Sequence, residues 1–101
     1  QNKVLVVYKL RGRPSNQINC PGLSIDRNAM AICGADSVVV SDCGSNSVFR
    51  VNIDSGDRLW TSNLVSKPEG VVCFKNRYVL VTNCNTDTRI WILDAETGVL
   101  L

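Results

Sequence analysis

The C-terminal third of the chain, residues 68–101, reads PEGVVCFKNRYVLVTNCNTDTRIWILDAETGVLL. Short apolar runs alternate in this stretch with clusters of Gly, Asn, Asp and Lys. The runs have the length of a strand and are rich in β-branched and aromatic residues, whereas the clusters have the composition of turns. The stretch therefore predicts a four-stranded antiparallel meander, with strands at about residues 70–74, 78–83, 89–94 and from 98 onward.

The same unit occurs once more upstream. Residues 36–43 (DSVVVSDC) align with residues 77–84 (RYVLVTNC) at an offset of 41, and residues 48–51 align with residues 90–93 at an offset of 42. This second copy predicts strands at about residues 29–33, 37–42, 47–53 and 57–62.

A partial third copy lies at the N-terminus, with strands expected at about residues 3–8 and 13–19. In all three copies a glycine follows the first apolar strand residue by eight positions, and glycine suits a turn that needs positive φ. The three pairs are Val4 and Gly12, Val48 and Gly56, and Ile90 and Gly98.

The strands at 37–42 and 78–83 are apolar almost without alternation, through Val38-Val39-Val40 and Val79-Leu80-Val81. Continuous apolar strands imply that both faces of the sheet are covered. Sheets stacked face to face provide that cover, and a period near 41 with four strands is typical of a β-propeller blade. An eight-stranded sandwich is the structural alternative.

We therefore predict an all-β fold, a partial β-propeller of about two and a half four-stranded antiparallel blades. Residues 1–101 form a single domain in this prediction. Residues 1–20 supply the last two strands of a first blade, residues 27–62 a second blade and residues 68–101 a third. Such an incomplete stack leaves blade faces exposed, so the chain is either a fragment of a longer propeller or self-associates.

Three segments carry a family resemblance: Pro68–Val72, Tyr78–Asn83 and Thr88–Asp94. They resemble the NHL-type propeller repeat and the similar YVTN repeat, and the tail LDAETGVLL is similar to that of quinoprotein-like propellers. The upstream copy departs from the pattern, because Arg27-Asn28-Ala29 replaces Pro68-Glu69-Gly70.

The resemblance implies a non-enzymatic protein-interaction scaffold, such as the substrate-recognition end of tripartite-motif ubiquitin ligases. Two alternatives stay open. One is an RNA-binding NHL propeller that uses basic turns, and the other is a remnant of a lactonase-like or quinoprotein-like enzyme.

The composition of the chain argues against an active site built from its residues alone. The chain has no histidine, so neither a Ser-His-Asp nor a Cys-His arrangement can be built from it. Its carboxylates are scattered over turns, and we expect Asp42 and Asn83 to hold the turns after their strands through hydrogen bonds to the backbone. Trp60 and Trp91 are expected to pack between blades. We expect no cofactor and no metal.

Basic residues gather in two predicted turns. They form the candidate surface for RNA or a protein partner, and they are Lys9, Arg11, Arg13, Lys75 and Arg77. The net charge of +2 does not by itself indicate a nucleic-acid binder.

Five cysteines are present, an odd number without a CxxC pair. Most of them lie on or beside apolar runs, which favours buried thiols and a reducing, cytoplasmic compartment. They are Cys20, Cys33, Cys43, Cys73 and Cys84. No apolar run approaches the length of a membrane span.

Overall fold

The computed structural model describes residues 3–8, 14–20, 28–83 and 89–101. The described residues form nine strands and no helix. The strands are β1 Lys3–Tyr8, β2 Pro14–Cys20, β3 Asn28–Ile32, β4 Ser37–Asp42, β5 Ser47–Asn52, β6 Arg58–Ser62, β7 Pro68–Phe74, β8 Tyr78–Asn83 and β9 Ile90–Asp94. No helix capable of crossing a membrane occurs in this described part of the chain.

Strands pair with their neighbours in chain order, always antiparallel. β1 and β2 form a hairpin, β3 to β6 form a four-stranded sheet and β7 to β9 form a three-stranded sheet. The predicted fourth strand of the last unit is reduced to one bridge between Leu93 and Leu100. The prediction of an all-β fold built from antiparallel meanders is confirmed.

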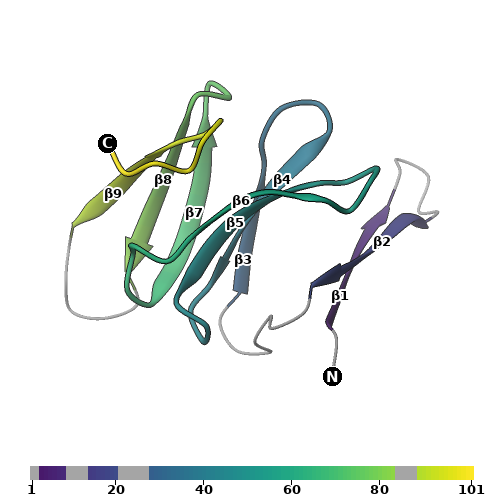
Figure 1. Cartoon of the computed structure of the whole chain (residues 1–101), viewed down its shortest axis with the longest axis horizontal. Coiled ribbons are helices and arrows are strands. Elements are labelled where there is room, and N and C mark those ends of the chain that lie inside the picture. The colour runs from purple at the N-terminus through teal and green to yellow at the C-terminus, as the bar shows by residue number, and fades with distance from the viewer. Residues whose placement is uncertain (1–2, 9–13, 21–27, 84–88) are drawn as a thin grey trace.

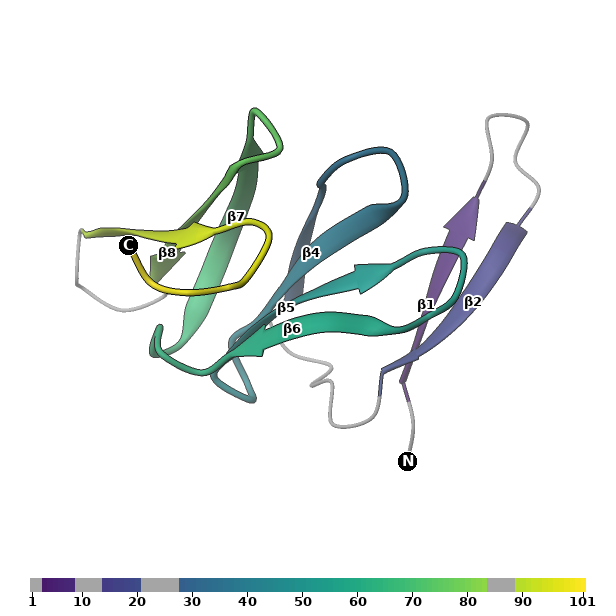
Figure 2. The same ribbon diagram turned by 45° about the horizontal axis from the view of Figure 1, so that its top comes forward.

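The three sheets lie one after another. β1–β2 lies on one side of the β3–β6 sheet and β7–β9 lies on the other (Figure 1, Figure 2). The described strands do not close into a ring.

The turns after β5 and β9 contain the same hydrogen bonds. This explains why a glycine follows the first apolar strand residue by eight positions in both repeats. Asn52 ends β5 and Asp94 ends β9, and each side chain accepts hydrogen bonds from the backbone N–H groups two and three residues further on, at 2.8–3.0 Å. Each turn then closes with a glycine in the left-handed region, Gly56 at φ 79° and Gly98 at φ 77°. The turns after β5 and β9 therefore have the same local structure.

The main core lies between the β3–β6 and β7–β9 sheets. Val39 of β4 points into it, and so do Val79 and Val81 of β8, which are two residues apart as the period of a strand requires. Its buried members are Cys33, Val39, Val48, Trp60, Val65, Val79, Val81, Leu93 and Ala95.

Arg50 connects the two sheets with hydrogen bonds to three acceptors. Its guanidinium donates to the Ala95 carbonyl at 2.7 Å, to the Ser37 hydroxyl at 2.7 Å and to the Cys33 carbonyl at 3.2 Å. The indole of Trp60 donates to the same Ala95 carbonyl at 2.8 Å. The predicted packing of Trp60 between repeat units is confirmed, since the side chain is 9% exposed in the core.

The polar residues at the ends of β4 and β8 contact neighbouring segments. Asp42 is fully buried and accepts a hydrogen bond at 2.7 Å from the hydroxyl of Ser45, which lies in the turn after β4. The Asn83 amide donates to the Ser66 carbonyl, and its oxygen accepts from the indole of Trp91. Asn83 thus joins β8 to the loop before β7 and to β9, while the turn that follows it lies outside the described residues.

The expectation of buried thiols is wrong for two cysteines. Cys33, just after β3, forms a disulfide with Cys73 of β7, with their Cα atoms 5.4 Å apart. The bond joins the two sheets directly, so the argument for a reducing compartment loses its basis. Cys43 keeps its thiol. The thiols of Cys20 and Cys84 fall outside what the structure describes.

The predicted cover on both faces of the valine-rich strands holds for β4 but not for β7–β9. Val39 and Val40 point to opposite faces of β4, and both are fully buried. In the last sheet Val79 and Val81 are fully buried, whereas Val72 is 55% exposed. One face of the β7–β9 sheet is therefore open.

Replacing Cys33 and Cys73 together by serine should lower the free energy of unfolding by about 4 kcal/mol, because the bond closes a loop of 40 residues in the unfolded chain. Urea unfolding of the oxidised protein measures this loss. Cys43→Ser is the control and should change stability little. Equal stability of the wild type with and without reductant would contradict the expectation.

Gly98→Ala should be more destabilising than Gly56→Ala. Both changes put a Cβ on a residue with positive φ, but at Gly98 that atom would lie 2.5–3.0 Å from ring atoms of Trp60. We expect a loss of about 1 kcal/mol at Gly56 and about 3 kcal/mol at Gly98. Thermal or urea unfolding of the two variants gives the comparison, and equal losses would show that the contact with Trp60 carries no cost.

Candidate functional site

One sheet face is apolar and is not covered by any other described part of the chain. We call it the open face of β7–β9. Pairing across the sheet aligns its members in rows, with Val72 opposite Leu80 and Leu80 opposite Ile92. Its members are Val72, Phe74, Tyr78, Leu80, Ile90 and Ile92.

Four of these large apolar side chains are at least 40% exposed to solvent. Ile90 is 59% exposed, Val72 55%, Phe74 48% and Ile92 40%. Leu80 at the centre is half-buried. Single exposed apolar residues are ordinary on a protein surface, but a contiguous group on a regular sheet marks an interaction surface.

The internal repeat shows that an open face is the exception for this position. Leu80 corresponds to Val39 and Ile90 corresponds to Val48 by the offsets of 41 and 42. Val39 and Val48 are both fully buried, because the β7–β9 sheet packs on them. The same repeat position is thus covered in one sheet and exposed in the next.

The turn between β7 and β8 borders the open face. Lys75 and Asn76 have φ of 54° and 55°, and the Arg77 N–H donates to the Phe74 carbonyl at 3.0 Å, as in a type I′ hairpin turn. The side chain of Asn76 accepts a hydrogen bond from the Gly34 N–H at 2.9 Å. This contact anchors the turn to the turn between β3 and β4.

Two of the predicted basic site residues lie in this turn. Lys75 and Arg77 are exposed, and their charged groups lie over the rings of Phe74 and Tyr78 at 5.3 and 5.5 Å from the centroids. The structure thus places both cations beside the open face. The other predicted members, Lys9, Arg11 and Arg13, lie outside the described residues.

Acidic groups lie close to Arg77. A polar pocket of about 280 Å³ is lined by Asn76, Arg77, Asp94 and Glu96. The backbone N–H groups of Thr97 and Glu96 hold the pKa of Asp94 below its ordinary value, and the charge of Arg77 acts in the same direction. The local field at Arg77 is therefore mixed, which weakens a phosphate-binding role for this turn.

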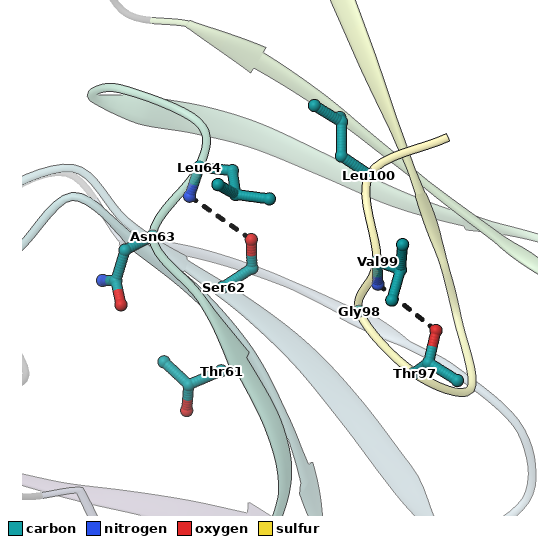
Figure 3. Close-up of a pocket in the computed structure, with 8 residues that line it drawn as sticks. All are labelled: Thr61, Ser62, Asn63, Leu64, Thr97, Gly98, Val99 and Leu100. Carbon is teal, nitrogen blue, oxygen red and sulfur yellow. Dashed lines mark hydrogen bonds between the residues drawn. The ribbon is translucent and has the colours of Figure 1, made fainter.

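A second pocket, of about 380 Å³, lies between the end of β6 and the segment after β9 (Figure 3). The Leu64 N–H donates to Ser62 Oγ at 3.4 Å and the Val99 N–H to Thr97 Oγ1 at 3.3 Å. Its lining has no titratable side chain, so it offers no general acid or base. The lining residues are Thr61, Ser62, Asn63, Leu64, Thr97, Gly98, Val99 and Leu100.

Within the described ranges, no three side chains of His, Cys, Asp or Glu come together in a way that could hold a metal ion. The candidate site is the open face, which the sequence analysis did not identify. The apolar residues of this face could be read from the sequence. Their continuous pattern, however, predicted that both faces of the sheet are buried.

Comparison with models of known protein families, with curated protein sequences and with solved structures finds no match for this chain.

Asp94→Asn should flatten the loss of stability in acid. Asn52 makes the same two backbone contacts in the equivalent turn, so the amide keeps the turn but cannot titrate. Because the folded pKa of Asp94 is lowered, its contribution is complete above the unfolded pKa and disappears as the pH falls through the folded value. Urea midpoints between about pH 5 and pH 2 should therefore fall more steeply for the wild type. Parallel curves for the two proteins would contradict this role of Asp94.

Proposed function

We propose that the chain is a non-enzymatic protein-interaction module of β-propeller type, which binds protein through the open face of β7–β9. The observation that carries the proposal is the exposure of four large apolar side chains on one ordered sheet: Val72, Phe74, Ile90 and Ile92. Burying such a surface against a partner removes apolar area from water, at about 25 cal/mol for each Å².

The open face is well suited to association because its backbone is already fixed. β8 is paired on both sides, with β7 and β9, and the reverse face of the sheet is packed into the main core. No loop has to become ordered when a partner binds. A preformed surface therefore loses less of its contact energy to conformational entropy. Phe74 supplies an aromatic side chain, and aromatic residues are enriched at protein–protein interfaces.

Two features support the propeller-type architecture. The sheets follow each other in chain order with one core between β3–β6 and β7–β9, and the covered face of the first sheet has the same repeat positions as the open face of the second. The resemblance of the repeats to NHL-type and YVTN-type units agrees with this arrangement.

The absence of histidine in the chain and the lining of the two pockets support a binding role over a catalytic one. The RNA-binding alternative is weaker at Arg77, since Asp94 and Glu96 line the same pocket. The alternative of an enzyme remnant rests only on the similarity of the tail LDAETGVLL to quinoprotein-like propellers.

The proposal is tested by placing a photo-crosslinking residue on the open face at Ile90 in the cells that make the protein. Leu64, which is 62% exposed in the loop after β6, is the matched control position. We expect discrete protein adducts from position 90 and none of comparable yield from position 64. Adduct yields at position 90 no higher than at the control would contradict a protein-binding face.

A further inference from the structure

We propose that Cys73 is the site at which a low-molecular-mass thiol, such as glutathione, forms a mixed disulfide with this protein, and that Cys33 is the thiol released. The reaction opens the bond that joins the β3–β6 sheet to the β7–β9 sheet. The two sulfurs of that bond have different surroundings, which decide where a thiol attacks. The site is independent of the function proposed for the open face.

The two cysteines differ in their access to solvent. Cys33, directly after β3, is fully buried in the main core. Cys73 packs against that core from β7 and keeps part of its surface exposed. β7 is also an edge strand, because among the described strands it pairs with β8 alone. A thiolate from solvent must reach the sulfur that it attacks, so access favours attack at Cys73.

The surroundings of Cys33 favour it as the leaving group. In thiol–disulfide exchange the sulfur that is not attacked departs as a thiolate, and it departs faster when its negative charge is stabilised. Burial alone would disfavour this charge. The Arg50 guanidinium lies against the same residue, however, and donates to the Cys33 carbonyl at 3.2 Å. Because a nearby guanidinium stabilises a thiolate, this fixed cation compensates for the absence of water around Cys33.

The exchange balances without any further reactant. The thiolate of glutathione attacks Cys73 Sγ, an S–S bond forms between them, and the bond between Cys73 and Cys33 breaks. Cys33 leaves with the electron pair of that bond and takes up the proton that the glutathione thiol lost. The glutathione sulfur is oxidised and the Cys33 sulfur is reduced. Attack by Cys33 on the new bond restores the original disulfide and releases glutathione.

A mixed disulfide at Cys73 loosens the contact between the sheets. Cys73 lies opposite Val79 of β8, and Val79 is fully buried in the core between the two sheets. A glutathione tripeptide is far larger than the Cys33 sulfur that it replaces, and a closely packed core does not accept added volume without displacement. The adduct also lacks the cross-link between the sheets. The cysteine pair is therefore a redox-sensitive connection.

The oxidised full chain is the starting material for the test. Iodoacetamide first blocks free thiols such as that of Cys43. Reduced glutathione is then added, and N-ethylmaleimide stops the exchange after short intervals. Peptide mapping by mass spectrometry identifies the cysteine that carries glutathione and the cysteine that carries the maleimide label. The matched control is the same protein in a urea concentration that unfolds it, where both sulfurs are open to attack.

In the folded protein we expect glutathione on Cys73 and maleimide on Cys33, with a preference of at least about tenfold over the reverse pattern. The unfolded control should carry nearly equal amounts of glutathione on both cysteines. Equal amounts in the folded protein, or glutathione mainly on Cys33, overturn the assignment. So does a folded protein that reacts only as fast as its unfolded fraction, because the native bond would then be closed to thiols.

Discussion

The packing of the β7–β9 sheet against the β3–β6 sheet is the interaction on which the rest of the structure depends. Neither sheet has an independent core, because a single sheet cannot bury its own faces. Val39, Val48 and Trp60 from one side meet Val79 and Leu93 from the other. Each such side chain contributes about 1.5–3 kcal/mol when it leaves water. The polar bonds of Arg50 and the disulfide from Cys33 to Cys73 then fix how the two sheets are placed on each other.

The turns after β5 and β9 have the same structure in both sheets. Asn52 and Asp94 capture the same backbone N–H groups, and Gly56 and Gly98 take the same left-handed conformation. Equivalent residues in the two sheets therefore point in equivalent directions, and covered and open faces can be compared position by position. This correspondence, together with the exposure of the last sheet, is the basis for proposing a binding surface there.

The strands could be predicted from the sequence because their signals are local. The bounds of β4 and β8 follow from an apolar run between turn residues, and the glycine spacing at Gly56 and Gly98 predicted the turns that the structure contains. Local chemistry does not depend on what packs against it. The prediction therefore succeeded without knowledge of the sheet arrangement.

The features that the sequence did not reveal all depend on how the sheets pack. The disulfide joins Cys33 and Cys73, which are brought together only by packing between sheets. The bond from Arg50 to the Ala95 carbonyl depends on the same packing, whereas its other two acceptors, Cys33 and Ser37, lie in the turn between β3 and β4 of its own sheet. The open face was not predicted because a continuous apolar pattern indicates only that both faces of a strand can be buried. The pattern does not show whether the residues that bury a face come from the same chain.

Equivalent repeat positions are buried in the β3–β6 sheet and exposed in the β7–β9 sheet. Hydroxyl-radical labelling of the dilute protein, followed by mass spectrometry, measures this side chain by side chain. We expect strong labelling of Ile90 and Phe74 and protection of Val48 and Val39. Labelling of Val48 at the rate of Ile90, or protection of Ile90 in the dilute protein, would contradict it.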